Sequence, residues 1–400
     1  MSGPLDGFRV LELGSTVAGP YCGRILGDFG AEVIKVEPPE GDPVRNMGAH
    51  VNGQSLYAAS ILRNKSLIVL DLRKAEAREV VRDLAAKCDV LVENFRPGTL
   101  ERWGLGFDAL SRLFPRLVMV RISGFGQTGP YRGRPGYGFL GDAVGGLLHI
   151  NGYPDRAPVR AAVPVTDMVT ATNAALGAVM ALLAREKTGK GQCIDAALCE
   201  TAFGLMEEHV PAYDRLGRIP GRAGSRLPGS TPNSLYPTAD GGFIAVAAAS
   251  DAVFRRLVAV MGQPGLAEEE RFATGMARNR NVEALDDIIG QWTRGFPLME
   301  LEAALQRSEV PASRVFTMAD VFADPHFAER GAIARVADPE LGAVAMTAPL
   351  PRLSDTPGSI RRAGGRTGRD TVAVLKQVCG YDDERIRTLR DCGAIGAAPD

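Results

Sequence analysis

The chain has 400 residues, of which 45% are hydrophobic and 23% are charged. This length exceeds what one small core needs, and it predicts two domains. The 46 Lys and Arg residues are balanced by 47 Asp and Glu residues, which gives a formal net charge of -1. We therefore expect no general attraction to nucleic acid or to a membrane, so that any anion-binding site has to be local.

Cysteine and histidine spacing argues against a bound metal. The closest cysteine pair, Cys193 and Cys199, has neither zinc-ligand nor redox spacing, and no histidine stands in an HExxH pattern. Reduced thiols and a cytoplasmic location are therefore expected. The N-terminal residues lack the pattern of a secretory signal. The longest apolar run, residues 174–184, falls short of the ~20 residues that a membrane-spanning helix needs.

The first third of the chain alternates short β-branched runs with helical patterns. Helices are predicted at Gly19–Phe29 and Ala75–Lys87. Strands are predicted at Phe8–Leu13, Glu32–Glu37, Ser66–Leu70, Val90–Asn94 and Leu117–Ser123. This alternation is typical of an α/β fold with a parallel sheet covered on both faces. In such a fold ligands bind beyond the carboxyl ends of the strands.

The middle of the chain begins with a loop region and ends at a predicted domain boundary. Residues 124–164 are rich in Gly and Pro, which favours turns and close backbone approach. A strong helix follows, opened by Thr166 and Asp167 and ending near Lys187, and another is predicted around residues 200–216. The basic, glycine-rich stretch 218–229 then indicates a linker.

A second domain is predicted after this linker. Residues 234–248 have the pattern of a hairpin that turns at 240–242. Helical patterns follow at 251–261, 282–292 and 298–309. These elements predict a small α+β domain over residues 233–314. Further on, residues 332–336 and 343–347 have strand-like patterns.

The opening strand–turn–helix unit permits a dinucleotide-binding hypothesis. Gly14 and Gly19 do not form the GxGxxG spacing of that motif, however. Glycines that let the strand and the helix pack closely explain them better. A dinucleotide-binding oxidoreductase is therefore kept only as an alternative.

Blocks spread along nearly the whole chain carry a more specific signal. In order they are LDGFRVLELGSTVAGPYCGRILGDFGAEVIKVE, GDPVR, LRNKSLIVLDLR, DVLVENFRPGTLERWGLG, SGFGQTGPY and VTDMVTATNAALGAVMALLAREKTGKGQ, followed by SLYPTADGGFIAVAA and VPASRVFTMADVFADPHFAERGAI. With these blocks the chain resembles the family III CoA-transferases, the group that includes formyl-CoA and carnitine CoA-transferases.

The resemblance implies a complete architecture. A Rossmann-like large domain combines residues 1–217 with the returning residues 326–400. A small domain, 233–314, lies between them, flanked by linkers at 218–232 and 315–325. Two chains interlock as a homodimer. The implied partners are an acyl-CoA and a carboxylic acid, without nucleic acid or membrane.

The resemblance also assigns a nucleophile. Asp167, in VTDMV, falls on the catalytic aspartate of the family, which forms an aspartyl anhydride and then an aspartyl-CoA thioester. Exchange between thioesters needs no ATP, metal or nicotinamide. A carboxylate near the start of a helix stays ionised, which suits this role. Taken on position alone, Asp167 would more simply be a helix N-cap.

CoA contacts are implied at positions that follow several strands. The matching residues are Val17, Ala18, Leu70, Asp71, Leu72, Arg73, Asn94, Phe95, Arg96, Arg102, Pro135, Gly136, Tyr137 and Gly138. The basic residues Arg63 and Lys65 are further candidates near the strand ends. The chain departs from the oxalate-linked members, which carry a glutamate where Gly138 stands, and from members with an arginine in place of Pro38.

The similar-looking members imply succinyl-CoA as donor and a C4 or C5 dicarboxylate as acceptor. Arginine suits a second carboxylate, and Arg45, Arg222 and Arg226 are candidates. An α-methylacyl-CoA racemase is an alternative, as is an inactive CoA-binding protein. Racemisation needs two bases around the α-carbon. The racemase histidine is replaced here by Tyr137, whereas His149 is expected to be a packed histidine.

Overall fold

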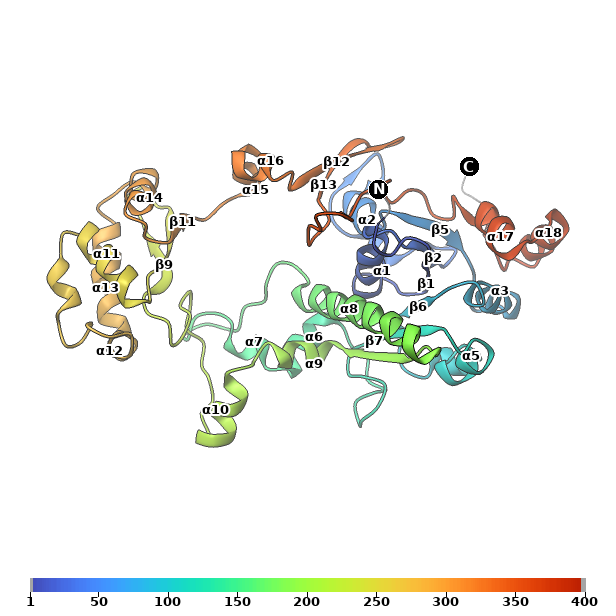
Figure 1. The fold of residues 1–400 in the computed structure, drawn as a ribbon, viewed down its shortest axis with the longest axis horizontal. Coiled ribbons are helices and arrows are strands. Elements are labelled where there is room, and N and C mark those ends of the chain that lie inside the picture. Colours follow the sequence, from blue (N-terminus) through green and yellow to red (C-terminus); the bar gives the residue numbers. More distant parts are fainter. Residues whose placement is uncertain (1–2, 397–400) are drawn as a thin grey trace. The chain divides into compact units, whose positions relative to one another are not determined.

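The computed structural model describes residues 3–396 as two compact units (Figure 1). The first unit comprises residues 3–147, 161–217 and 328–396. The second unit comprises residues 148–160 and 218–327. The chain therefore leaves the first unit and returns to it, and each unit has a hydrophobic core of its own.

A six-stranded parallel sheet forms the centre of the first unit, in the order β5-β2-β1-β6-β7-β8. The strands are β1 (Arg9–Glu12), β2 (Glu32–Glu37), β5 (Lys65–Val69), β6 (Val90–Glu93), β7 (Val118–Ser123) and β8 (Cys193–Ala197). The five predicted strands and the α/β class are confirmed, whereas β8 was not predicted. Because β1 pairs with β2 on one side and β6 on the other, the strand order reverses at β1.

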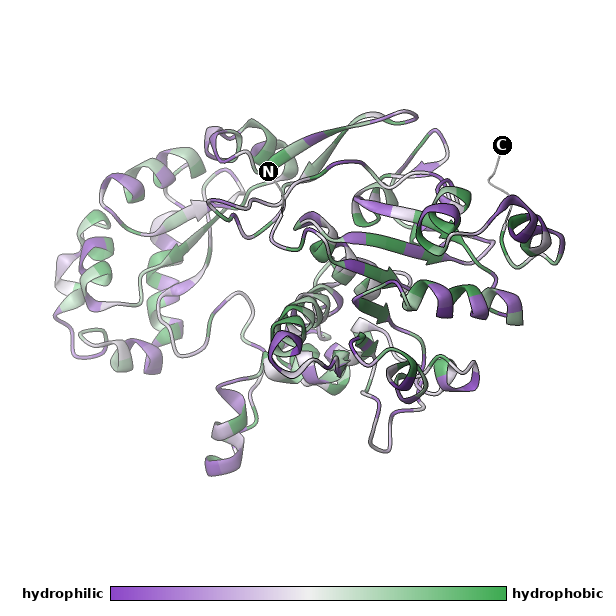
Figure 2. Ribbon diagram, turned by 45° about the vertical axis from the view of Figure 1, so that its right-hand side comes forward, coloured by the Kyte–Doolittle hydropathy of each residue, from purple (hydrophilic) through white to green (hydrophobic). Residues whose placement is uncertain are grey.

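Helices cover both faces of this sheet. Successive strand residues point to opposite faces, so Val10 and Leu11 enter different cores. One face packs against α1 (Ala18–Asp28) and α8 (Val165–Thr188). The other packs against α3 (Ala75–Ala85), α4 (Thr99–Arg102), α5 (Phe107–Leu113), α17 (Thr371–Cys379) and α18 (Asp383–Asp391). Figure 2 shows the sheet strands coloured mainly as hydrophobic residues.

The remaining elements of the first unit are short. They are η1 (Pro43–Asn46), β3 (His50–Val51), β4 (Gln54–Ser55), α2 (Leu56–Ile61), α6 (Gly138–Val144), α9 (Leu198–Gly204), α10 (His209–Leu216) and the antiparallel pair β12 (Ile333–Asp338) and β13 (Gly342–Thr347). Where one helix over 200–216 was predicted, α9 and α10 are separated by a turn. Pro211 lies in the first turn of α10, where a missing N–H is tolerated.

The second unit is built on a three-stranded antiparallel sheet, ordered β11-β10-β9. Its strands are β9 (Asn233–Pro237), β10 (Phe243–Ala247) and β11 (Ala312–Arg314). The predicted hairpin is the β9–β10 pair. The helices are α11 (Asp251–Val260), η2 (Pro264–Ala267), α12 (Gly275–Arg280), α13 (Val282–Thr293), α14 (Leu298–Arg307) and α15 (Met318–Ala323), while α7 (Leu147–Ile150) and α16 (Pro325–Glu329) lie at the unit limits.

Candidate active site

A cavity of about 290 Å³ opens at the carboxyl ends of the parallel strands. It lies where the strand order reverses at β1, the position at which open α/β sheets bind ligands. Its lining comes from the last residues of β2 and from the segments that follow β1, β2, β5 and β6: Leu13, Ser15, Lys35, Val36, Pro38, Glu40, Pro43, Leu70, Asp71, Leu72, Arg73, Phe95 and Trp103. Five predicted CoA-binding residues, 70–73 and Phe95, are thus brought together.

Most of the side chains that line this cavity are apolar, with an aromatic pair on one side. The rings of Phe95 and Trp103 meet edge to face, with centroids 5.5 Å apart. The guanidinium of Arg78 lies 5.6 Å from the Trp103 ring centroid and supports it. An apolar crevice of this kind, with aromatic side chains, suits a flat heteroaromatic group.

Charged side chains stand at the rim of the cavity. Arg73 is 67% exposed and donates to Asp71 at 2.6 Å and to Glu40 at 3.0 Å. The hydrogen bond from Arg73 lowers the pKa of the Asp71 carboxyl. Arg73 is therefore a solvent-exposed cation that a phosphate could reach, although it already pairs with two carboxylates.

Asn94 joins two segments of the predicted CoA site. Its side-chain amide donates to the Ser15 carbonyl oxygen at 2.8 Å, and its Oδ1 accepts from the Ser15 N–H at 2.7 Å. This reciprocal pair ties the end of β6 to the β1–α1 loop. Val17 and Ala18, also predicted to contact CoA, are buried at the start of α1 next to that loop.

The two other predicted basic residues of the block that follows β6 lie on its exposed side. Arg96 donates to the Gly133 carbonyl oxygen, which connects this block to the glycine-rich loop before α6. Arg102 donates to the Thr99 hydroxyl at 3.2 Å, within α4. Both guanidiniums reach solvent, so they remain available to an anionic ligand.

Asp167 is the third residue of α8 and lies in its first turn. The N-cap of α8 is Pro164, so Asp167 does not fill the N-cap position that was the simpler alternative. Its neighbour Thr166 is buried and donates to Asp142. The first-turn backbone N–H groups and the helix dipole favour a negative charge at this place.

Gly138, the first residue of α6, lies directly against this carboxylate. A Cβ on residue 138 would stand 2.7 Å from Asp167 Cγ and closer still to Oδ2. A glycine here is what lets the Asp167 carboxylate occupy its position. The neighbouring Tyr137 is the N-cap of α6 and is exposed, while Gly136 packs so tightly that its Cβ would stand 2.7 Å from Gly124 Cα.

Tyr57, on α2, lies near enough to Asp167 for the charge of that carboxylate to act on its hydroxyl, and it was missed from the sequence. Its hydroxyl oxygen is buried, and within residues 3–396 it has no hydrogen-bond partner. Burial raises the pKa of Tyr57, and the charge of Asp167 raises it further. The two side chains are therefore electrostatic neighbours. SLYAAS has no feature that singles out this tyrosine, since only the tertiary fold brings α2 toward α8.

Arg63 and Lys65, the extra basic candidates, are fully buried in ion pairs. Arg63 meets Asp28 at 2.5 Å and Lys65 meets Glu12 at 2.7 Å. They cannot reach a phosphate in solvent.

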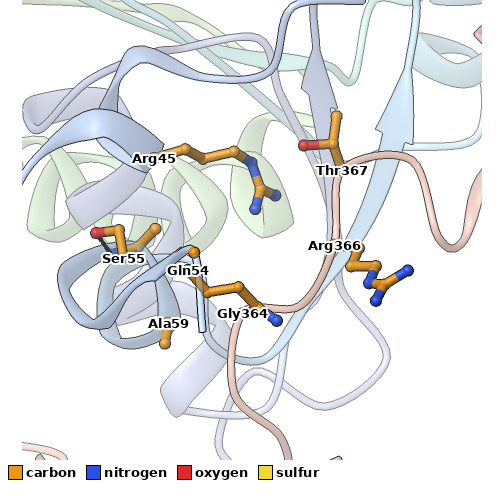
Figure 3. A pocket seen from close by; sticks show the side chains of 9 residues that line it. Arg45, Gln54, Ser55, Ala59, Gly364, Arg366 and Thr367 are labelled. Atoms are coloured by element: carbon orange, nitrogen blue, oxygen red, sulfur yellow. Dashed lines mark hydrogen bonds between the residues drawn. The ribbon is translucent and has the colours of Figure 1, made fainter. Parts of the chain in front are cut away.

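The three arginines predicted for a second carboxylate each have protein partners. Arg45 donates to Glu37 at 2.6 and 2.7 Å and to the Gly365 carbonyl oxygen at 2.8 Å. It lines a second cavity of about 210 Å³, with Gln54, Ser55, Arg366 and Thr367 (Figure 3). In the second unit, Arg226 pairs with Asp286 at 2.5 Å, and Arg222 donates to the backbone oxygens of Tyr153 and Pro154.

An α/β fold with a cavity at the strand reversal has the arrangement in which open parallel sheets bind their ligands. The sequence model of CoA-transferase family III matches residues 5–371, and the chain belongs to that family. The predicted family is confirmed, and the chain is an enzyme that transfers CoA.

Relatives with names and with solved structures agree. The chain is 45% identical to succinyl-CoA–D-citramalate CoA-transferase of Chloroflexus aurantiacus, over 97% of each chain. It is 34% identical to human succinyl-CoA:glutarate CoA-transferase, over 98% of this chain and 90% of that one. The structure of a CAIB/BAIF family protein from Brucella suis superposes with a TM-score of 0.83 at 36% identity, covering 94% of this chain and all of that one.

Proposed function

We propose that the enzyme transfers CoA from succinyl-CoA to a C4 or C5 dicarboxylic acid, with Asp167 as the nucleophile. The observation that carries the proposal is the carboxylate of Asp167, which lies in the first turn of α8 against a glycine that leaves it room. The named activities of the similar enzymes, toward citramalate and glutarate, support the choice of donor and acceptor.

Four displacements complete the proposed cycle. Asp167 attacks the thioester carbonyl carbon of the donor, the carbon–sulfur bond breaks, and CoA leaves as a thiolate from a mixed anhydride. The thiolate attacks the aspartyl carbonyl and releases succinate, leaving an aspartyl-CoA thioester. The acceptor carboxylate attacks this thioester and again expels the thiolate. The thiolate then attacks the acceptor carbonyl of the new anhydride, which frees Asp167.

CoA binding is assigned to the cavity at the strand ends. The apolar walls beside Phe95 receive the adenine, and Arg73, Arg96 and Arg102 bind phosphates. The pantetheine arm runs past Val17 and Ala18 toward Asp167, with residues 135–138 near the thioester. The first-turn N–H groups of α8 stabilise the oxyanions that form there.

The three arginines proposed for a second carboxylate differ in how far their charges are already balanced within residues 3–396. Arg45 and Arg226 already pair with Glu37 and Asp286, which balance their charges. Arg222 donates to neutral carbonyl oxygens instead, so its charge still favours an anionic group.

We also propose that the enzyme acts in the cytoplasm as an interlocked homodimer. The 24-residue α8 is long and apolar enough to cross a membrane. Only 39% of its most apolar stretch is buried within the chain, so an apolar part of the helix is exposed. Leu176, Met180 and Leu183 are 52%, 58% and 64% exposed and share one face of the helix. A second copy that covers this face would account for it.

Mass spectrometry of CoA thioesters tests the proposed reaction. The protein is mixed with succinyl-CoA and a panel of mono- and dicarboxylic acids, beside an Asp167→Asn variant. We expect new dicarboxyl-CoA thioesters with the wild type and none with the variant, which should still bind CoA. Undiminished transfer by Asp167→Asn would refute the mechanism. Deuterium uptake at the α-carbon of a branched acyl-CoA, without transfer, would instead support the racemase alternative.

A further inference from the structure

The β1–α1 loop, residues 14–17, connects the two halves of the candidate site. Ser15 lines the cavity at the strand ends, and Val17 belongs to the same apolar cluster as Tyr57, the neighbour of Asp167. Thr16 has φ of +69°, a left-handed conformation that residues with a Cβ rarely adopt. A loop in this conformation needs support from the structure around it.

Two buried, oppositely charged side chains provide that support. Asp42 Oδ1 accepts from the Thr16 N–H and from the Val44 N–H, each at 2.9 Å. Its Oδ2 lies 2.8 Å from Lys35 Nζ, and Lys35 also donates to the Gly14 carbonyl oxygen. Lys35 and Asp42 are each 1% exposed. The pair thus holds the loop from both sides of Ser15.

A second buried pair lies behind the first. Glu12 is 2.7 Å from Lys65 Nζ and 3.6 Å from Lys35 Nζ, and Lys65 donates to the Pro20 carbonyl oxygen in α1 at 2.6 Å. Two carboxylates and two ammonium groups therefore balance one another. Since a buried ion pair is weak evidence for stability, such a network calls for another explanation.

We propose that Lys35 and Asp42 are positioning residues of CoA transfer. They act through the Gly14 carbonyl and the Thr16 amide to hold the β1–α1 loop, so that the nucleotide cavity and Asp167 keep their separation. This inference rests on the proposed function, and it adds two residues that do not themselves touch the reacting atoms. Reacting groups misplaced by about 1 Å lose about 10²-fold in rate. A shift of this loop, which spans the site, is therefore expected to lower the rate of transfer by a similar factor.

The charge state of Asp42 agrees with this role. Burial opposes its ionisation, but Lys35 and the backbone donors Val44 and Thr16 outweigh burial, and the pKa of Asp42 lies below its usual range. Asp42 is therefore an anion, a strong acceptor for the Thr16 N–H.

The two oxygens of Asp42 allow the role to be dissected. Asp42→Asn keeps an oxygen for the Thr16 and Val44 N–H groups but removes the charge that faces Lys35. Asp42→Ala removes both functions. A double variant, Lys35→Met with Asp42→Asn, restores neutrality and keeps the acceptor. Arg185→Met is the control, because Arg185 is 3% exposed and pairs with Asp89 at 2.9 Å next to the amino end of β6.

Each variant is measured for kcat, KM for succinyl-CoA, Kd for free CoA, Tm and amide hydrogen exchange of residues 12–20. We expect Asp42→Ala to lower kcat/KM about 10²-fold and to weaken CoA binding. Its exchange in residues 12–20 should be faster. Asp42→Asn should lower kcat/KM several times less than Asp42→Ala does. The double variant should recover Tm but not the full kcat/KM, because the Gly14 carbonyl loses its donor.

The control separates positioning from stability alone. Arg185→Met should lower Tm while leaving kcat, KM, CoA binding and exchange of residues 12–20 as in the wild type. Asp42 variants that follow this same pattern would overturn the inference. If Asp42→Ala does not fold, the double variant decides, since wild-type kinetics and exchange in it would equally overturn the inference. A wild type that neither binds CoA nor transfers it would refute the proposed function instead, and hydrogen exchange would still report on the loop.

Discussion

Gly138→Ala tests whether the Asp167 carboxylate has to lie where it does. The new Cβ would stand 2.7 Å from Asp167 Cγ, whereas carbon atoms in contact are about 3.5–4.0 Å apart. The carboxylate must therefore move by about 1 Å, which is expected to cost about 10²-fold in rate. In free energy this loss is about 2.7 kcal/mol of transition-state stabilisation.

The same substitution should leave the fold intact, because the atom that has to move ends a short, flexible side chain. Alanine also suits a helix better than glycine by up to about 1 kcal/mol. The assay compares kcat at saturating succinyl-CoA and acceptor with Tm. Gly204→Ala in α9 is the matched control, since no atom lies within 4 Å of its added Cβ. A Gly138→Ala enzyme with wild-type kcat would show that the Asp167 carboxylate need not lie where it does.

Three further predictions concern other parts of the site. Tyr57→Phe should retain or raise Tm, since a buried hydroxyl without a partner in residues 3–396 is removed; a lower Tm in thermal unfolding would contradict this. Phe95→Ala should raise the Kd for CoA about 10- to 100-fold by calorimetry, as stacking on a base is worth about 1–3 kcal/mol, and wild-type affinity would place the adenine elsewhere. Asp42 has a lowered pKa in the folded protein, so the stability that its charge contributes is complete above the pKa of an unfolded Asp, near 3.9, and is lost as pH falls below that value. In urea unfolding from pH 6 to 3, the free energy of unfolding of Asp42→Asn should depend less on pH than that of the wild type. An equal pH dependence in the two proteins would contradict this.

The parallel sheet could be predicted because most of its strands have the apolar, β-branched composition that is typical of buried strands. Runs such as VLVE and VMVRIS are apolar and β-branched, as strands buried on both faces require. Strand β8, with the sequence CIDAA, has a single β-branched residue and takes its conformation from pairing with β7. Sequence patterns could not reveal it, since the partner rather than the propensity determines this strand.

The candidate site also contains some features that the sequence predicted and others that it could not predict. The segments after β5 and β6 were both predicted to contact CoA, and the cavity brings residues 70–73 together with Phe95. The contact of Asp167 with Gly138 could not be predicted, because it depends on how two helix starts approach. Nor could the burial of Lys35 and Lys65, since lysines are rarely buried without a partner and these partners come from other segments.

The proposed cycle requires that the carboxyl group of Asp167 be covalently activated, first as an anhydride and then as a CoA thioester. It is tested most directly by incubating the enzyme with succinyl-CoA in the absence of an acceptor, adding hydroxylamine, and sequencing the peptide that contains residue 167 by mass spectrometry. Hydroxylamine displaces CoA from an aspartyl thioester, or succinate from the aspartyl anhydride that precedes it, and either reaction leaves a hydroxamate on the side chain. We expect a hydroxamate at Asp167 that appears only with succinyl-CoA. An unmodified Asp167 in an enzyme that does transfer CoA once an acceptor is added, or a hydroxamate at another carboxylate, would rule out Asp167 as the nucleophile.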